Sequence, residues 1–231
     1  DKHGKKMSKS RGNIVDPMKL FDTYGADAVR WYFFTVNQPW DDKLFDEENI
    51  KRAKRNFLDL LHNSLKFYLT YREGALPGRV LSKKHILDAW VRSRLSAVRN
   101  DMTAAMDAYS IVEAARLLEQ FLAEDLSRWY VRRSRDRMRN QEGLTVLRDI
   151  LQEAAILASP FVPFSAEMVY QALGKKKESV HLENWPKKRP VNKKLLAEMD
   201  EIRALAARGL ELRARAGIKI RQPLLSFTVR K

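Results

Sequence analysis

The 231-residue chain contains no cysteine. This absence excludes disulfide bonds and any zinc site built from thiolates. Its four histidines are far apart in the sequence, so they give no support to a histidine metal cluster. No apolar run approaches the roughly 20 residues of a membrane-spanning helix, and no charged-then-apolar leader opens the sequence. We therefore expect no metal site and no membrane partner.

Internal repeats and low-complexity segments are also absent, and glycine and proline are few, at nine and eight residues. Hydrophobic residues make up 45% of the chain, enough for a packed core at this length. One long stretch, from about residue 47 to residue 71, carries an apolar stripe at helical spacing. The stripe consists of Ile50, Ala53, Phe57, Leu61, Leu65 and Tyr68. We predict a mainly α fold built on an antiparallel helix bundle.

Start signals predict further helices beginning near Asp16, Ser82, Ser110, Gly143 and Asn192. Residues 28–35 fit a strand or a helix by periodicity alone. The part before the bundle is therefore predicted as a small α/β segment. After the bundle, one helix to about residue 216 is followed by a short extended tail over residues 218–229.

Positive charge is in excess, with a formal net charge of +15. Residues 1–46 are close to neutral, whereas residues 126–148 carry seven arginines against two acids. Residues 175–231 carry 16 basic side chains against six acidic ones. Basic charge gathered in patches favours a polyanionic partner, most often nucleic acid. A solvated basic face or a membrane surface is the alternative, but no helix combines one cationic face with a richly aromatic one.

The polar segment over residues 6–10 is the best candidate for handling a polyphosphate. Lysine ammonium groups near a nucleoside triphosphate can offset the charge that builds on a leaving pyrophosphate. Lys6 and Lys9 can reach different phosphates, and Ser8 and Ser10 can donate hydrogen bonds. The glycine pattern of a P-loop is missing. By residue type alone, such a segment is more often plain protein surface.

The order of the residues changes this interpretation. Residues 6–10 read Lys-Met-Ser-Lys-Ser (KMSKS), which matches the signature loop of the class I aminoacyl-tRNA synthetases without a substitution. Four further stretches resemble the same family, in the expected order: residues 12–17 with 24–30, then 126–133, 159–167 and 217–224. They are similar to the branch that handles branched aliphatic amino acids. The stretch Trp-Tyr-Val-Arg-Arg at 129–133 favours the isoleucine enzymes over the valine enzymes, which are the nearest alternative.

This resemblance implies catalytic roles for Lys6 and Lys9, with Lys9 contacting ATP and stabilising pyrophosphate departure. Met7, Ser8 and Ser10 would complete the nucleotide-binding loop. It further implies ATP and Mg²⁺ as cofactors of a cytoplasmic full-length ligase that works in protein biosynthesis.

Important parts of that family are missing from this sequence. Its His-Ile-Gly-His signature, its nucleotide-binding sheet and its editing insertion do not occur here. We therefore expect a fragment separated from its N-terminal catalytic and editing domains. This fragment should bind no cofactor and be inactive alone.

The resemblance also implies four parts along the chain. Residues 1–15 would hold the KMSKS loop at the end of the catalytic domain, and residues 16–78 a segment that contacts the tRNA stem. Residues 79–175 would form the anticodon-binding helix bundle. Residues 176–231 would comprise a basic linker, a helix and the start of a further C-terminal domain.

Residues 129–137 are the candidate contacts to the anticodon stem-loop of tRNA. An aromatic ring beside guanidinium groups can stack an unpaired base and pair with its phosphates. The candidates are Trp129, Arg132, Arg133, Arg135 and Arg137. Two alternatives remain: Trp129 could belong to the bundle core, and the arginines could be solvated or paired with Asp125 and Asp136. A stand-alone RNA-binding helical module is the competing function.

Overall fold

The computed structural model describes residues 1, 3–73, 85–139, 141–174, 177–226 and 228. The regular structure of these residues is helical, and none of them belongs to a strand. The prediction of a mainly α fold is therefore confirmed. The chain divides into two compact units, residues 1–190 and residues 191–231.

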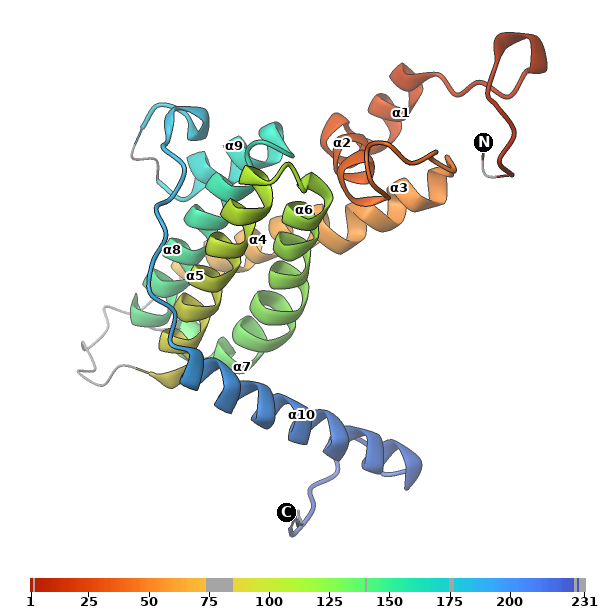
Figure 1. The fold of residues 1–231 in the computed structure, drawn as a ribbon. Helices are drawn as coiled ribbons and strands as arrows, with labels where there is room; N and C mark the ends of the chain where they lie inside the picture. The colour runs from red at the N-terminus through yellow and green to blue at the C-terminus, as the bar shows by residue number, and fades with distance from the viewer. Residues whose placement is uncertain (2, 74–84, 140, 175–176, 227, 229–231) are drawn as a thin grey trace. The chain divides into compact units, whose positions relative to one another are not determined.

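The first unit begins with a 3₁₀ turn and then contains a series of helices (Figure 1). In chain order the elements are η1 (Lys9–Arg11), α1 (Pro17–Tyr24), α2 (Ala26–Thr35), α3 (Glu47–Ala53), the π-helical η2 (Lys54–Leu58), α4 (Asp59–Glu73), α5 (Ile86–Asp107), α6 (Ile111–Gln120), the π-helical η3 (Phe121–Val131), α7 (Arg132–Ser134), the 3₁₀ element η4 (Arg135–Arg139), α8 (Gln141–Ala158), α9 (Pro163–Ala172) and the 3₁₀ turn η5 (Val180–Leu182).

Helix α2 resolves the ambiguity over residues 28–35 in favour of a helix. Ala28, Trp31 and Tyr32 are all buried, and their spacing of three and four residues places them on one helical face. Trp31 stacks on Phe57 with ring centroids 3.6 Å apart, and its indole Nε1 donates to Glu119 at 2.9 Å. A strand would point alternate side chains to opposite faces, so it would not bury these three residues on one face. The described part of residues 16–78 contains no strand, and the predicted α/β character of this segment is therefore wrong.

The long helix predicted from residue 47 is continuous through α3, η2 and α4. All six residues of its predicted apolar stripe are buried, so this prediction is confirmed. The helix widens into a π-turn at residues 54–58. Residues 74–84, which include the predicted boundary at 78/79 and the helix start predicted near Ser82, lie outside the described residues.

Helices α5, α6, α8 and the π-helical η3 form the bundle, and Figure 1 shows α5 running beside α6 and α8. Val98, Met102, Leu118 and Leu151 are fully buried within it. Helix α6 begins directly after Ser110, as predicted, but the Ser110 side chain makes no capping hydrogen bond. At the start of α5 the cap is His85, whose Nδ1 accepts from the Leu87 amide at 3.2 Å.

The second unit consists of α10 (Lys193–Arg215) and an irregular tail. The Asn192 side chain caps α10 by accepting from the Leu195 amide at 3.0 Å, as predicted. The tail predicted to be extended has no strand among its described residues. Arg213 donates to the carbonyls of Lys219 and Ile220 at 2.8 and 3.2 Å, and these bonds fold the tail back on its helix.

Candidate nucleic-acid interface

The KMSKS segment forms a short loop closed by Asn13. The Asn13 side chain accepts from the Ser8 amide at 3.0 Å and donates to the Lys6 carbonyl at 3.2 Å. Ser8 and Ser10 face each other, with hydroxyl oxygens 3.2 Å apart. Gly12 ends the η1 turn with a φ of 65°, in the left-handed region that favours glycine.

The two lysines of this loop are open to solvent. Neither ammonium group of Lys6 or Lys9 pairs with a carboxylate within the described residues. Met7 is 39% exposed. The loop thus presents two uncompensated positive charges on a locally ordered turn, which suits a polyanionic ligand.

Trp129 lies near the C-terminal end of η3 and is not among the fully buried residues of the bundle core. Its side chain is half-buried, whereas the neighbouring Tyr130 is fully buried. The Arg133 guanidinium carbon lies 3.8 Å from the centroid of the Trp129 ring, a cation–π contact one turn further on. The arrangement places a half-buried indole beside a cation, and an aromatic ring and a cation are the two groups that bind a single-stranded base and its phosphate.

The other candidate arginines differ in how they are held. Arg132, Arg133 and Arg135 are exposed. Asp125, considered above as a partner for them, is instead bound by Arg94 at 2.7 Å. Their guanidinium groups therefore add positive charge to this end of the bundle without being neutralised by Asp125.

Arg137 has a different environment from the other four candidates. Its Nη1 and Nη2 nitrogens donate to both oxygens of Asp88, at 3.0 and 2.5 Å, and only a quarter of its side chain is exposed. Burial lowers the pKa of Arg137, but the hydrogen bonds and charge of Asp88 more than offset this, so the pKa is raised. Arg137 is therefore bound within the protein by Asp88, unlike the exposed Arg132, Arg133 and Arg135.

Asp88 also accepts a hydrogen bond from the buried hydroxyl of Tyr130, at 2.8 Å. Burial raises the pKa of the Tyr130 hydroxyl, and the charge of Asp88 raises it further. One carboxylate in the first turn of α5 therefore fixes both Tyr130, beside Trp129, and Arg137. Sequence reasoning missed Asp88, because its two partners are 42 and 49 residues away and only its place in a first helical turn gave any signal.

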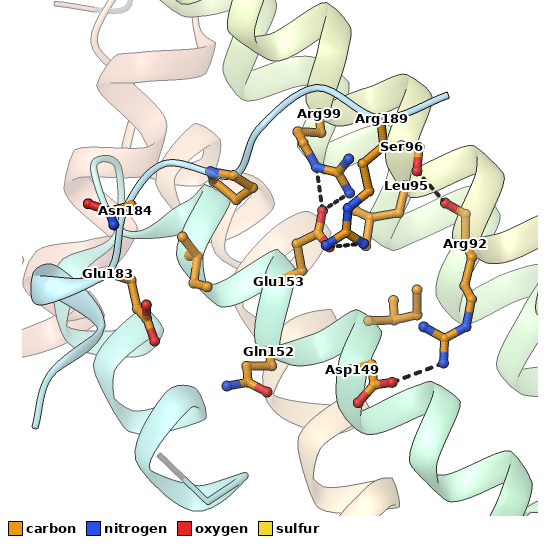
Figure 2. Close-up of a pocket in the computed structure, with 13 residues that line it drawn as sticks. Arg92, Leu95, Ser96, Arg99, Asp149, Gln152, Glu153, Glu183, Asn184 and Arg189 are labelled. Carbon is orange, nitrogen blue, oxygen red and sulfur yellow. Dashed lines mark hydrogen bonds and ion pairs between the residues drawn. The ribbon is translucent and has the colours of Figure 1, made fainter. Parts of the chain in front are cut away.

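A pocket of about 390 Å³ lies on another face of the first unit, between α5, α8 and residues 183–189 (Figure 2). Its charged groups neutralise one another: the buried Arg99 binds Glu153, and Arg92 binds Asp149 at 2.9 Å. Asn100 exchanges two hydrogen bonds with the Arg189 backbone, at 2.9 and 3.2 Å. The ion pairs and hydrogen bonds around the pocket therefore attach residues 183–189 to helices α5 and α8.

In the described part of the chain, no group of three or more histidine, aspartate or glutamate side chains is placed to hold a metal ion. None of the described helices has the length and apolar character needed to cross a bilayer.

Comparison with protein families gives two matches. A model described as the anticodon-binding domain of tRNA ligase matches residues 88–229. A second, described as tRNA synthetases class I (I, L, M and V), matches residues 1–46. The second match contains the KMSKS loop, and the first contains the bundle with Trp129 and Arg133.

Curated relatives match the whole chain but only a small part of their own length. The isoleucine–tRNA ligase of Clostridium tetani is 39% identical over 99% of this chain and 24% of the relative. The enzyme of the same name from Deinococcus radiodurans is 37% identical over 100% of this chain and 22% of the relative. The chain thus spans about a quarter of the length of these relatives.

Two solved structures share the fold. The Agrobacterium radiobacter K84 agnB2 LeuRS, solved with tRNA and LeuAMS, superposes with a TM-score of 0.63 at 22% identity, over 85% of this chain and 23% of that one. The Mycobacterium tuberculosis methionyl-tRNA synthetase in complex with methionyl-adenylate gives a TM-score of 0.60 at 25% identity, over 75% of this chain and 36% of that one.

Proposed function

Because the chain belongs to the family of anticodon-binding domains of tRNA ligases, we propose that it binds the anticodon stem-loop of a tRNA. The observation that carries this proposal is the Trp129 ring with Arg133 stacked on it, beside the exposed Arg132 and Arg135. An unpaired loop base would stack on the ring while the guanidinium groups bind its phosphates. Arg137 would support this surface from below through Asp88, rather than touch RNA.

The parent protein, in this proposal, is an isoleucine–tRNA ligase, since the curated relatives carry that name. It would join isoleucine to its tRNA with ATP and Mg²⁺ in the cytoplasm. Lys9, supported by Lys6, would bind ATP phosphates and stabilise the charge that develops on pyrophosphate. The solvent-open ammonium groups of both lysines on the Asn13-closed loop support this role.

The four-part division of the chain belongs to the same proposal. Residues 1–15 would complete the catalytic domain, residues 16–78 would contact the tRNA stem, and residues 79–175 would hold the anticodon. Residues 176–231 would lead toward a further domain. The family matches over residues 1–46 and 88–229 support this order of parts.

The double variant Arg132→Ala/Arg133→Ala tests the RNA interface. We expect its affinity for an anticodon stem-loop RNA to fall at least tenfold at physiological salt. Its plot of log affinity against log salt should flatten by roughly 1.4, because each lost single-strand phosphate contact removes about 0.7 from the slope. Fluorescence anisotropy at several salt concentrations measures both quantities.

The matched control is Lys5→Ala/Arg11→Ala, which removes the same net charge from exposed positions in residues 1–15, outside the parts proposed to contact tRNA. This control should leave the affinity within about twofold. If the Arg132/Arg133 variant keeps the wild-type affinity and salt slope, the proposed interface is wrong.

The isolated chain should show no isoleucine-dependent exchange of pyrophosphate into ATP. Stabilisation of the leaving group by the lysine loop requires a bound nucleotide and amino acid, and the histidine signature does not occur in this sequence. A full-length isoleucine–tRNA ligase assayed in parallel is the positive control. Exchange by the purified chain above background would contradict the prediction.

A further inference from the structure

Two aromatic side chains near the end of α4 lie outside the buried stripe of that helix. Phe67 and Tyr71 are one turn apart, with ring centroids separated by 4.4 Å, and both are half-buried. Leu61, Leu65 and Tyr68 are buried and form the core-facing side without them. Adjacent aromatic rings that the core does not need, on a partly wet surface, are typical of a contact site for another molecule.

Arg135 connects this aromatic pair to the RNA-facing run of arginines. Its Nε donates to the Tyr71 hydroxyl at 3.2 Å, across 64 residues of sequence, and this bond raises the pKa of Arg135. Within the described residues, the two terminal nitrogens of Arg135 make no other hydrogen bond or ion pair. The Arg72 guanidinium lies 5.9 Å from the Tyr68 ring, so the end of α4 carries a second cation.

We propose that Phe67, Tyr71 and Arg135 form a second site for an unpaired RNA base, next to the one at Trp129 and Arg133. The base would lie on the exposed part of the Tyr71 ring, and its phosphate would bind the terminal nitrogens of Arg135. The hydroxyl of Tyr71 holds the guanidinium beside the ring in the absence of RNA. Less side-chain freedom is therefore lost when RNA binds.

This inference rests on the proposed function, and it specifies how much of the loop is held. The two sites draw their rings from different elements, Trp129 from η3 and Tyr71 from α4. Each would therefore hold its own unpaired base, as in a single-stranded loop, whereas the bases of a duplex remain stacked and paired.

The variant Phe67→Leu/Tyr71→Leu tests the second site in the full 231-residue chain. We expect its affinity for an anticodon stem-loop RNA to fall about tenfold, the order of one lost stacked base. The salt slope should not change, because no charge is removed. Affinity for a fully paired RNA duplex of the same length should also not change. Tyr71→Phe keeps the ring and releases Arg135, so it should lose less affinity than the double variant.

Two controls separate this inference from the proposed function. Trp129→Ala should weaken stem-loop binding whether or not the second site exists, and thermal unfolding by circular dichroism shows whether each variant is folded. Loop RNA carrying 4-thiouridine, irradiated with the wild-type chain, should crosslink to Phe67 or Tyr71. If Trp129→Ala weakens binding but Phe67→Leu/Tyr71→Leu does not, or if crosslinks form only elsewhere, the second site is wrong. If the wild-type chain binds no stem-loop RNA, the proposed function itself fails.

Discussion

Replacement of Asp88 by alanine is expected to lower the free energy of unfolding by about 3–5 kcal/mol. The Asp88 side chain is 11% exposed, and its carboxylate is the acceptor for both Tyr130 and Arg137. Removing it leaves a fully buried hydroxyl without this partner and a mostly buried guanidinium without its counter-charge. Chemical denaturation followed by circular dichroism measures the loss.

Two comparison variants separate the contributions within this network. Tyr130→Phe removes one hydroxyl and leaves the ion pair, so it should cost only about 0.5–1.5 kcal/mol. Asp149→Ala removes a half-exposed carboxylate that pairs with the surface Arg92, and it should cost less than about 1 kcal/mol. If Asp88→Ala destabilises the chain no more than Asp149→Ala does, Asp88 does not organise this end of the bundle.

In a full-length isoleucine–tRNA ligase that carries this loop, Lys9→Ala is expected to lower the rate of pyrophosphate exchange by 10²- to 10³-fold. This estimate rests on the proposed role of Lys9, and it is the usual effect of removing one group that stabilises transition-state charge. The KM for isoleucine should change little, because the lysine contacts phosphates and not the amino acid. Steady-state exchange assays at varied isoleucine and ATP concentrations measure both.

Lys5→Ala is the matched control, since it removes a neighbouring exposed lysine from outside the five-residue motif. It should leave the exchange rate within a few fold. Stem-loop binding by the 231-residue chain should be unaffected by either substitution. A Lys9→Ala enzyme with a normal exchange rate would remove the catalytic role proposed for the loop.

The helical fold was predictable from local patterns, and so was the family. The apolar stripe from Ile50 to Tyr68 is buried as predicted, because a spacing of three and four residues places side chains on one face of a helix. The resemblance to class I synthetases, based on the KMSKS motif and the later stretches, is confirmed by the family matches and relatives. Residues 28–35 could not be assigned by periodicity, because aromatic residues suit either a strand or a buried helix face.

The position of each candidate RNA contact could not be predicted in the same way. Trp129 and Tyr130 are adjacent in sequence, yet one reaches the surface and the other is fully buried. Arg135 and Arg137 are two residues apart, yet one is exposed beside Tyr71 and the other is bound to Asp88. Local composition gives neighbouring residues the same prediction, whereas their roles depend on what packs against each of them.

The sequence by itself determined the helical class, the buried stripe, the clustered positive charge and the family that the motifs indicate. These properties depend on residue type and short-range spacing, which the chain carries before it folds. Only the tertiary structure decided that Asp88 joins Tyr130 to Arg137 and that Tyr71 holds Arg135. These three contacts join residues more than 40 positions apart, and only the packing of α4, α5, η3 and η4 brings those residues within hydrogen-bonding distance.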